Sequence, residues 1–243
     1  MNRDEQMPKV VSREEWLRAR KELLAKEKEW NRQRDALSAE RRKLPMVRIE
    51  KDYVFEGPEG RRTLGDLFQG RRQLLVYHFM FDPTWDEGCP HCSLVADNFA
   101  GALVHLTARD TTFAVISRAP LAKIERFKKR MRWDFPWLSS FGGDFNYDFH
   151  VTVDEAHPEY NYQVYYPIAH EMASRFKGPP PGEMPGLSVF LRDGAHISHT
   201  YSTFLRGLDL FINTYNFLDH TPLGRQEEDG RGMSSWVRYH DRY

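Results

Sequence analysis

The sequence predicts an α/β domain with three layers, in which helices cover both faces of a sheet. Two short runs, 74–81 and 113–116, are almost continuously apolar, as expected of strands that are buried on both faces. Between them, apolar residues recur at helical spacing over 94–106. Short apolar runs that alternate with amphipathic stretches are typical of domains that pack helices on a sheet. We expect this domain to span residues 48–220.

An N-terminal arm, residues 1–47, precedes the domain. Ser12 followed by Glu15 is a capping-box signature, so we expect a helix that begins here and runs to about Leu44, before Pro45. Apolar residues recur along it every seven positions: Trp16, Leu23, Trp30, Leu37 and Leu44. This stripe is narrower than the seam of a coiled coil. We expect the arm to lie across its own domain or across a second copy of the chain in a homodimer.

The remaining elements of the domain follow in order. A proline can open a helix over 120–131, because its fixed φ suits the first helical position. Residues 186–201 predict a β-hairpin that turns at an Asp-Gly pair. A final helix is expected over 203–218. The C-terminal extension, 221–243, could end as an edge strand or pack on another subunit.

Both cysteines lie between the first strand and the first helix, in the run Cys89-Pro90-His91-Cys92. If Cys89 caps the helix, Pro90 falls at the first helical position, and Cys92 follows one turn later within reach of Cys89. The positive end of the helix and a protonated His91 would stabilise a thiolate on Cys89. We therefore predict that Cys89 is a nucleophile, that Cys92 resolves the mixed disulfide and that His91 tunes the thiolate.

Other interpretations of the two cysteines remain open. A zinc site needs four ligands, and only histidines or carboxylates remain to supply the second pair, so we expect no metal. Cysteine is also often simply buried, and the pair could be an inert part of the core. Asp86 and Glu87 stand just upstream, and like charge near the sulfur would raise its pKa.

The order strand, helix, strand, helix, hairpin, helix is the thioredoxin arrangement, in which a C-x-x-C pair begins the first helix. Six runs carry a closer resemblance: DPTWDEGCPHCSL, FAVISRAPLAKIERFKKRM, FPWLSSFGGDFNYDFHV, GLSVFLRDG, HTYSTFLRGLDL and LDHTPLGRQE. Together they resemble a bacterial thioredoxin-like family known as domain of unknown function eight-nine-nine, from about Ser12 to Glu228. The resemblance implies a thioredoxin-like fold and leaves the activity unassigned.

A wider resemblance is to peroxiredoxins, because residues 135–140, FPWLSS, look like their short FPLLSD strand. Peroxiredoxins surround the reactive cysteine with P-x-x-x-T-x-x-C. Here Thr84 lies five positions before Cys89, and Asp86 occupies the place of the threonine. A thiol peroxidase is therefore an alternative to the oxidoreductase. A non-catalytic thioredoxin-fold module that binds other proteins is a second alternative.

The substrate cleft is expected beside the dithiol. Thioredoxins place a cis-proline there, and Pro185 is the candidate, although it could equally be an ordinary turn proline. The backbone of Met184 could then pair with an extended peptide. Trp85 and Pro185 would form the walls of the cleft, and Pro90 would contact the substrate next to the sulfur. The expected partner is a protein or small molecule that carries a thiol or disulfide.

An aromatic-rich insertion, about 133–184, separates the helix 120–131 from the hairpin. Tryptophan, phenylalanine and tyrosine alternate there with glycine, aspartate and asparagine. The insertion could form a lid beside Cys89 that sets the substrate class. We favour a packing role, as an ancillary layer or a dimer surface, because aromatic stripes usually pack.

Composition excludes several classes of function. Lys plus Arg and Asp plus Glu both total 35, so no net charge draws the chain to nucleic acid or to an anionic membrane. The start, MNRDEQMPKVVSREEW, has no apolar core of signal-peptide length, and no run approaches the ~20 apolar residues of a membrane span. We expect a cytoplasmic protein. No Gly-rich phosphate loop or dinucleotide fingerprint is present, so no cofactor is expected.

Overall fold

The computed structural model describes residues 7–166, 168, 182–227 and 234–243. The chain divides into two compact units. The arm unit comprises Met1–Pro45 and Phe217–Gln226, and the core unit comprises Met46–Asn216 and Glu227–Tyr243. Parts of the predicted insertion (167 and 169–181) and of the predicted C-terminal extension (228–233) lie outside the described residues.

The arm unit contains the long helix α1 (Arg13–Arg41). Its start is the predicted capping box: the Glu15 amide donates to Ser12 Oγ at 3.2 Å, and the Ser12 amide donates to a Glu15 carboxylate oxygen at 3.0 Å. The heptad-spaced apolar side chains, from Trp16 to Leu44, are exposed. What they contact in solution stays a prediction.

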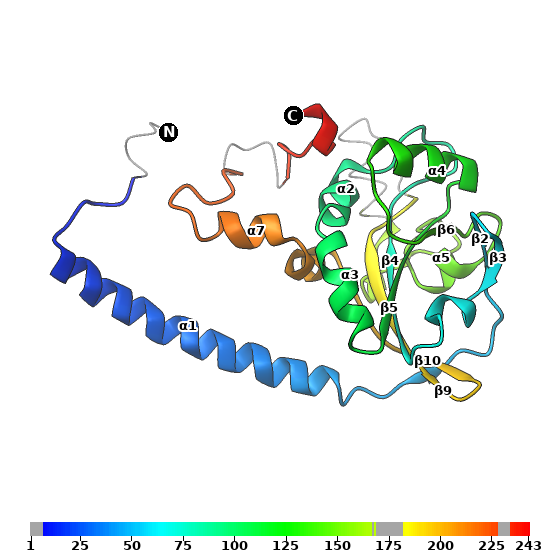
Figure 1. Cartoon of the computed structure of the whole chain (residues 1–243), viewed down its shortest axis with the longest axis horizontal. Helices are drawn as coiled ribbons and strands as arrows, with labels where there is room; N and C mark the ends of the chain where they lie inside the picture. Colours follow the sequence, from blue (N-terminus) through cyan, green and yellow to red (C-terminus); the bar gives the residue numbers. More distant parts are fainter. Residues whose placement is uncertain (1–6, 167, 169–181, 228–233) are drawn as a thin grey trace. The chain divides into compact units, whose positions relative to one another are not determined.

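A mixed sheet forms the centre of the core unit, and in the described residues it has eight strands in the order β1-β10-β9-β4-β5-β6-β2-β3 (Figure 1). The strands are β1 (Val47–Arg48), β2 (Val54–Gly57), β3 (Gly60–Thr63), β4 (Gln73–His78), β5 (Thr111–Ser117), β6 (Trp137–Ser139), β9 (Gly186–Asp193) and β10 (His196–Phe204). A separate two-stranded pair, β7 (Glu159–Tyr160) and β8 (Gln163–Val164), lies in the insertion.

The directions of the central strands confirm the predicted thioredoxin-like fold. β4, β5 and β6 run parallel to one another, whereas β9 is antiparallel to β4 and β10 is antiparallel to β9. The predicted hairpin closes where Asp193 pairs with His196. Gly194 takes a positive φ of 57° in this turn, a conformation that costs glycine little.

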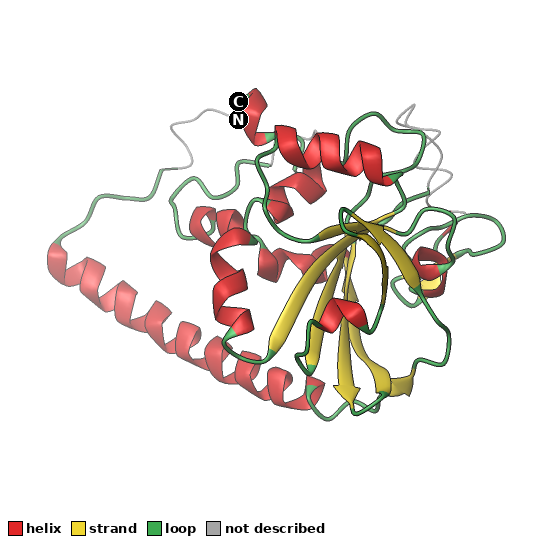
Figure 2. Ribbon diagram, turned by 45° about the vertical axis from the view of Figure 1, so that its right-hand side comes forward, coloured by secondary structure: helices red, strands yellow, loops and turns green. Residues whose placement is uncertain are grey.

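Helices cover both faces of the curled sheet (Figure 2). The helical segments of the core unit are η2 (Asp66–Phe68), α2 (Pro90–Ala96), α3 (Ala100–Thr107), α4 (Leu121–Arg130), α5 (Phe145–Asp148), η3 (Leu205–Phe211) and η4 (His240–Arg242). A further helix, α7 (Asn213–Leu218), starts in the core unit, and its last two residues are assigned to the arm unit. Side chains of α2, α3, α4 and η3 pack on one face with Phe113 and Val115 of β5. Those of η2 and α5 pack on the other with Ala114 and Ile116. The alternation along β5 separates the two layers.

Two expected helices differ in the structure. The helix expected over 94–106 is two helices, because α2 ends at Ala96 and α3 starts at Ala100. At this break the Asn98 side chain donates to the Leu94 carbonyl at 2.6 Å, in competition with the helical backbone bond. The helix expected over 203–218 is also wrong at its start, because Thr203 is still paired in β10. The 3-10 helix η3 follows, and α7 comes only after an extended Ile212.

The described aromatic side chains of the insertion pack largely inside the core unit. Phe135 and Trp137 join the layer of α2 and α4, and Phe145 and Phe149 join the opposite layer. The end of the chain also packs here, because Tyr239 is buried in the first of these layers. Residues 234–243 form no strand, so of the two possibilities for the extension the edge strand is not seen in these residues.

Candidate functional site

The loop from β4 to α2 brings the two cysteines together. Cys89 is the N-cap of α2 with extended backbone angles, and Pro90 occupies the first turn, as predicted. The backbone of Met80, just after β4, forms hydrogen bonds with both cysteines. Its carbonyl accepts from the Cys89 amide at 3.0 Å, and its own amide donates to Cys92 Sγ at 3.4 Å. Both cysteines carry free thiols.

The two thiols differ in access to solvent. Cys92 is 1% exposed and Cys89 is 9% exposed, so Cys89 is the sulfur nearer to an incoming molecule. Both belong to the apolar layer of α2 and α4, which excludes water from the pair. The more exposed sulfur is the one for which we predict the role of nucleophile, and that role stays a prediction.

His91 touches Cys89 with one ring nitrogen and the end of the chain with the other. Nδ1 lies 3.9 Å from Cys89 Sγ, and Nε2 lies 3.2 Å from the carbonyl oxygen of Ser234. A carbonyl oxygen only accepts hydrogen bonds, so Nε2 carries the proton. Nδ1 is then left to share the proton of the Cys89 thiol, as S–H···N or as thiolate and imidazolium.

The surroundings separate the pKa values of the two thiols. Hydrogen bonding from Cys92 holds the pKa of Cys89 well below its ordinary value, against burial, and His91 acts in the same direction as Cys92. Burial raises the pKa of Cys92 well above its ordinary value. The hydrogen bond with Cys89 raises the pKa of His91. The arrangement favours a thiolate on Cys89, an imidazolium on His91 and a thiol on Cys92.

The acidic residues before the motif do not face the sulfur as free charges. Glu87 forms ion pairs with Arg130 and with Arg242, the latter at 2.6 Å. Asp86 is exposed. We expected the negative charge of Glu87 to raise the pKa of Cys89. The two guanidinium groups offset this effect, because they pair with that charge.

The last residues of the chain, which we call the C-terminal segment (234–243), complete this side of the site. The Tyr239 hydroxyl donates to the Gly88 carbonyl at 2.7 Å, directly before Cys89. Trp236 packs against the layer that holds both thiols. Sequence reasoning missed this contribution. The available signal was the apolar character of Trp236, Val237 and Tyr239 in an otherwise polar tail.

Two buried tyrosines near the dithiol were also missed. Tyr77, in β4, is 1% exposed, and its hydroxyl has no hydrogen-bond partner of regular geometry among the described residues. It lies beside Cys92, and it lowers the pKa of that thiol against the effect of burial. The Tyr160 hydroxyl donates to the Pro185 carbonyl at 2.7 Å. A tyrosine within an apolar strand was the one sequence signal for Tyr77.

The residues predicted for the substrate cleft have mixed surroundings. Trp85 is half-buried and packs against the layer of the two thiols, and Pro90 is half-buried at the start of α2. The Met184 amide donates to the Val151 carbonyl at 2.8 Å, so it is not free for an incoming peptide. The described residues contain no cis peptide bond, so Pro185 follows a trans bond, which corresponds to the ordinary turn proline of the two alternatives.

The threonine next to the motif is engaged elsewhere. The Thr84 hydroxyl donates to Asp82 at 2.6 Å. This side chain therefore already has a partner other than Cys89.

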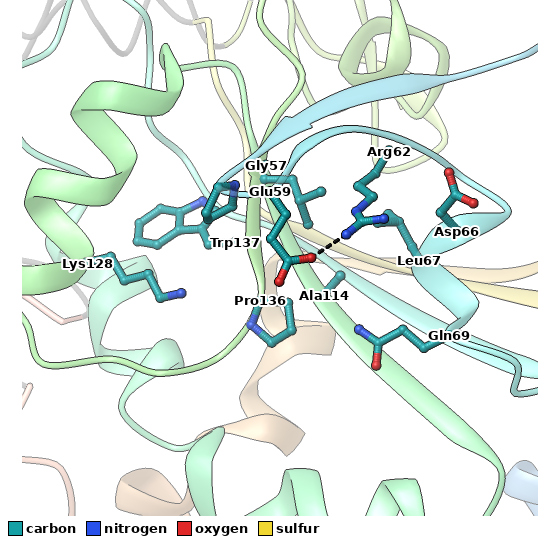
Figure 3. Close-up of a pocket in the computed structure, with 12 residues that line it drawn as sticks. Gly57, Glu59, Arg62, Asp66, Leu67, Gln69, Ala114, Lys128, Pro136 and Trp137 are labelled. Carbon is teal, nitrogen blue, oxygen red and sulfur yellow. Dashed lines mark hydrogen bonds and ion pairs between the residues drawn. The ribbon is translucent and has the colours of Figure 1, made fainter.

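A pocket of about 540 Å³ lies between the β2–β3 hairpin, η2 and the start of β6 (Figure 3). Its walls carry charges of both signs, including the Arg62–Glu59 ion pair and Lys128. None of the residues predicted for the site lines it.

Within the described residues, no cluster of three or more His, Cys, Asp or Glu could hold a metal ion. The same part of the chain has no helix that is both long and apolar enough to span a bilayer.

A family model described as "Bacterial protein of unknown function (DUF899)" matches residues 5–243, so the chain belongs to that family. No curated protein matches the chain. Among solved structures, the chain is similar to peroxidoxin BcpB from Mycobacterium tuberculosis (16% identity, 70% of this chain, 94% of that chain, TM-score 0.47). It is also similar to a cysteine-to-serine mutant of PrxQ from Xylella fastidiosa (15% identity, 68% of this chain, 88% of that chain, TM-score 0.42).

Proposed function

We propose that this member of the bacterial family is a thiol–disulfide oxidoreductase, with Cys89 as nucleophile and Cys92 as resolving thiol. One observation carries the proposal: His91 lies between the Cys89 sulfur and the Ser234 carbonyl, with Nδ1 directed at the sulfur. A histidine held in this way stabilises the thiolate, which is the reactive form of cysteine. A cytoplasmic setting, which keeps thiols reduced, suits such a dithiol.

In the first step, the Cys89 thiolate attacks one sulfur of a substrate disulfide. The substrate S–S bond breaks as the Cys89–substrate bond forms, and the departing thiolate takes a proton from the His91 imidazolium. The Cys89 thiolate keeps His91 protonated until it has reacted. The proton is then available for the departing substrate thiolate.

In the second step, Cys92 attacks the Cys89 sulfur in the mixed disulfide, and the proton that Cys92 loses is transferred to the second substrate sulfur as the Cys89–substrate bond breaks. The second substrate thiol leaves, and the dithiol becomes a Cys89–Cys92 disulfide while the substrate disulfide becomes two thiols. Met80 favours this step because its amide donates to the Cys92 sulfur and stabilises negative charge there. An external thiol reductant returns the disulfide to the dithiol. The substrate is a protein or small molecule with an accessible disulfide.

The test is reduction of insulin by dithiothreitol with the wild-type chain, Cys89→Ser and Cys92→Ser. We expect the wild type to accelerate reduction, Cys89→Ser to lose the acceleration, and Cys92→Ser to accumulate a mixed disulfide that intact-mass spectrometry detects. Equal rates for wild type and Cys89→Ser would overturn the proposal and favour a non-catalytic module.

A parallel assay follows hydrogen peroxide with the same three proteins. Under the proposal, the wild type consumes peroxide no faster than Cys89→Ser does. Rapid consumption that is lost in Cys89→Ser and kept in Cys92→Ser, without insulin reduction, would replace the oxidoreductase with a thiol peroxidase.

A further inference from the structure

Glu227 holds the turn at Ser234–Val237, which we call the C-terminal turn and whose Ser234 carbonyl lies on His91. One carboxylate oxygen, Oε1, accepts from the Ser234 amide at 2.8 Å and from the Trp236 indole Nε1 at 2.9 Å. The Tyr215 hydroxyl lies 3.5 Å from the same oxygen and also bonds the Ser234 hydroxyl. Glu227 therefore binds the amide of Ser234, and the carbonyl of the same residue accepts from His91.

The peptide of Ser234 connects these contacts. With its amide fixed on Glu227, the orientation of the residue is restricted, and its carbonyl faces His91 Nε2 at 3.2 Å. His91 is exposed, so its ring is not enclosed by the core, and its two ring nitrogens contact the Cys89 sulfur and the Ser234 carbonyl. When one ring nitrogen of a histidine forms a hydrogen bond, that bond fixes the tautomer and the orientation of the ring, and so determines what the other nitrogen can do.

We propose that Glu227 is a positioning residue, which holds the C-terminal turn so that the Ser234 carbonyl keeps His91 Nδ1 on the Cys89 sulfur. The proposal rests on the proposed function, because it assigns a partner to the same dithiol. It places the C-terminal segment inside the working site, so that chemistry at Cys89 depends on residues about 140 positions later in the chain.

Several charged or titratable groups act on this pair from different elements. Cys92 and His91 on α2, Tyr77 on β4 and Tyr239 on the C-terminal segment surround Cys89. Glu227 and the Ser234 carbonyl act on His91 from the end of the chain, and both raise its pKa. A test of Glu227 must therefore separate its effect through His91 from a general change in charge.

The experiment measures the rate of the first alkylation of the reduced full-length chain by iodoacetamide as a function of pH, with intact-mass detection. Loss of the turn weakens the hydrogen bond that stabilises the thiolate. Glu227→Ala should therefore raise the pH midpoint by about one unit. Glu227→Gln retains an oxygen in the place of Oε1, so it should show less than half of that shift. Glu155→Ala, which removes an exposed carboxylate in the core unit, is the matched control and should leave the midpoint unchanged.

The same substitution in a His91→Ala background gives the decisive comparison. If Glu227 acts through His91, Glu227→Ala adds no further shift there. An unchanged midpoint in the single variant, or an equal shift with and without His91, would overturn the proposal. If Glu227→Ala does not fold, Trp236→Phe removes one of the donors to Oε1 and should raise the midpoint by a smaller amount. No change in that variant would also count against the proposal.

This titration uses no disulfide substrate, so it separates the two proposals. If the wild type does not accelerate insulin reduction, but Glu227→Ala still shifts the pH midpoint of alkylation, only the proposed function is contradicted. Normal insulin reduction with a midpoint that is independent of Glu227 would contradict the positioning role alone.

Discussion

Cys89 and Cys92 sit one helical turn apart, yet their surroundings push the two thiols in opposite directions. Hydrogen bonds from Cys92 and His91 lower the pKa of Cys89, whereas burial raises the pKa of Cys92. The spacing and the role of Pro90 were predictable from the sequence, because a proline at the first helical turn fixes where the helix begins. Other groups that act on the pair come from β4 and the C-terminal segment, which no local pattern connects to the motif.

Tyr77 gives a test at the scale of a single hydroxyl group. A buried hydroxyl without a partner destabilises a fold by about 1–3 kcal/mol. Tyr77→Phe should therefore increase the free energy of unfolding of the reduced protein by about 1 kcal/mol, measured by urea titration.

Tyr160→Phe is the matched control for this measurement. Its hydroxyl is bonded to the Pro185 carbonyl at 2.7 Å and accepts from the Leu205 amide at 3.3 Å. Removing it leaves those partners unsatisfied, so this variant should lose about 1–3 kcal/mol. If both variants lose stability equally, Tyr77 has a partner and our account of its hydroxyl is wrong.

The loop between β4 and α2 is the element that carries the site, and Gly88 sets its path. A Cβ on Gly88 would lie 2.6 Å from a ring carbon of Phe79 and 2.9 Å from one of Phe127. Both rings are buried, so they cannot move aside cheaply. The Gly88 carbonyl also receives the Tyr239 hydroxyl, which joins the loop to the C-terminal segment.

Gly88→Ala should therefore destabilise the chain by about 1–3 kcal/mol, because overpacking forces neighbouring rings from their positions. It should also increase the alkylation rate of Cys92 as the loop loosens. Gly101→Ala is the control, because Gly101 lies in α3 with open space around its Cβ position. That variant should gain about 0.5–1 kcal/mol. A Gly88→Ala variant with wild-type stability and thiol protection would show that the loop adapts.

The elements predicted best are those with a local physical cause. The β4 and β5 strands follow from continuous apolar runs, and the start of α1 follows from a capping box, in which the two partners are three positions apart. The break between α2 and α3 and the 3-10 geometry of η3 were not predicted. Apolar spacing continues across both places, and the breaks depend on side-chain bonds and strand pairing.

At the scale of the whole molecule, a buried network links the insertion to the central sheet. Glu183 accepts from Arg118 at 2.8 Å, from Thr152 at 3.0 Å and from Asn146 at 3.2 Å. Burial raises the pKa of Glu183 to about 7, although Arg118 acts to lower it. The carboxyl group therefore binds a proton more tightly in the folded chain than in the unfolded chain, where its pKa has the ordinary value of 4.5.

A raised pKa in the folded state contributes stability that is complete below pH 4.5 and is lost as the pH rises to about 7. One pKa unit corresponds to about 1.4 kcal/mol, so the loss amounts to about 3 kcal/mol. Glu183→Gln should remove this decline, measured by urea unfolding between pH 5 and pH 8. The exposed Glu155→Gln should keep it. The same slope in wild type and Glu183→Gln would contradict the assignment.

The sequence alone determined the order of the main strands and helices, the capping of α1 and the place of the dithiol at the start of α2. Each depends on residues within a few positions of one another, where spacing fixes geometry. Only the tertiary structure decided which groups surround the thiols: Tyr77 from β4, Met80 just after it, and Ser234 and Tyr239 from the end of the chain. Such contacts join residues far apart in the chain, and they exist only because packing of the core brings those segments together.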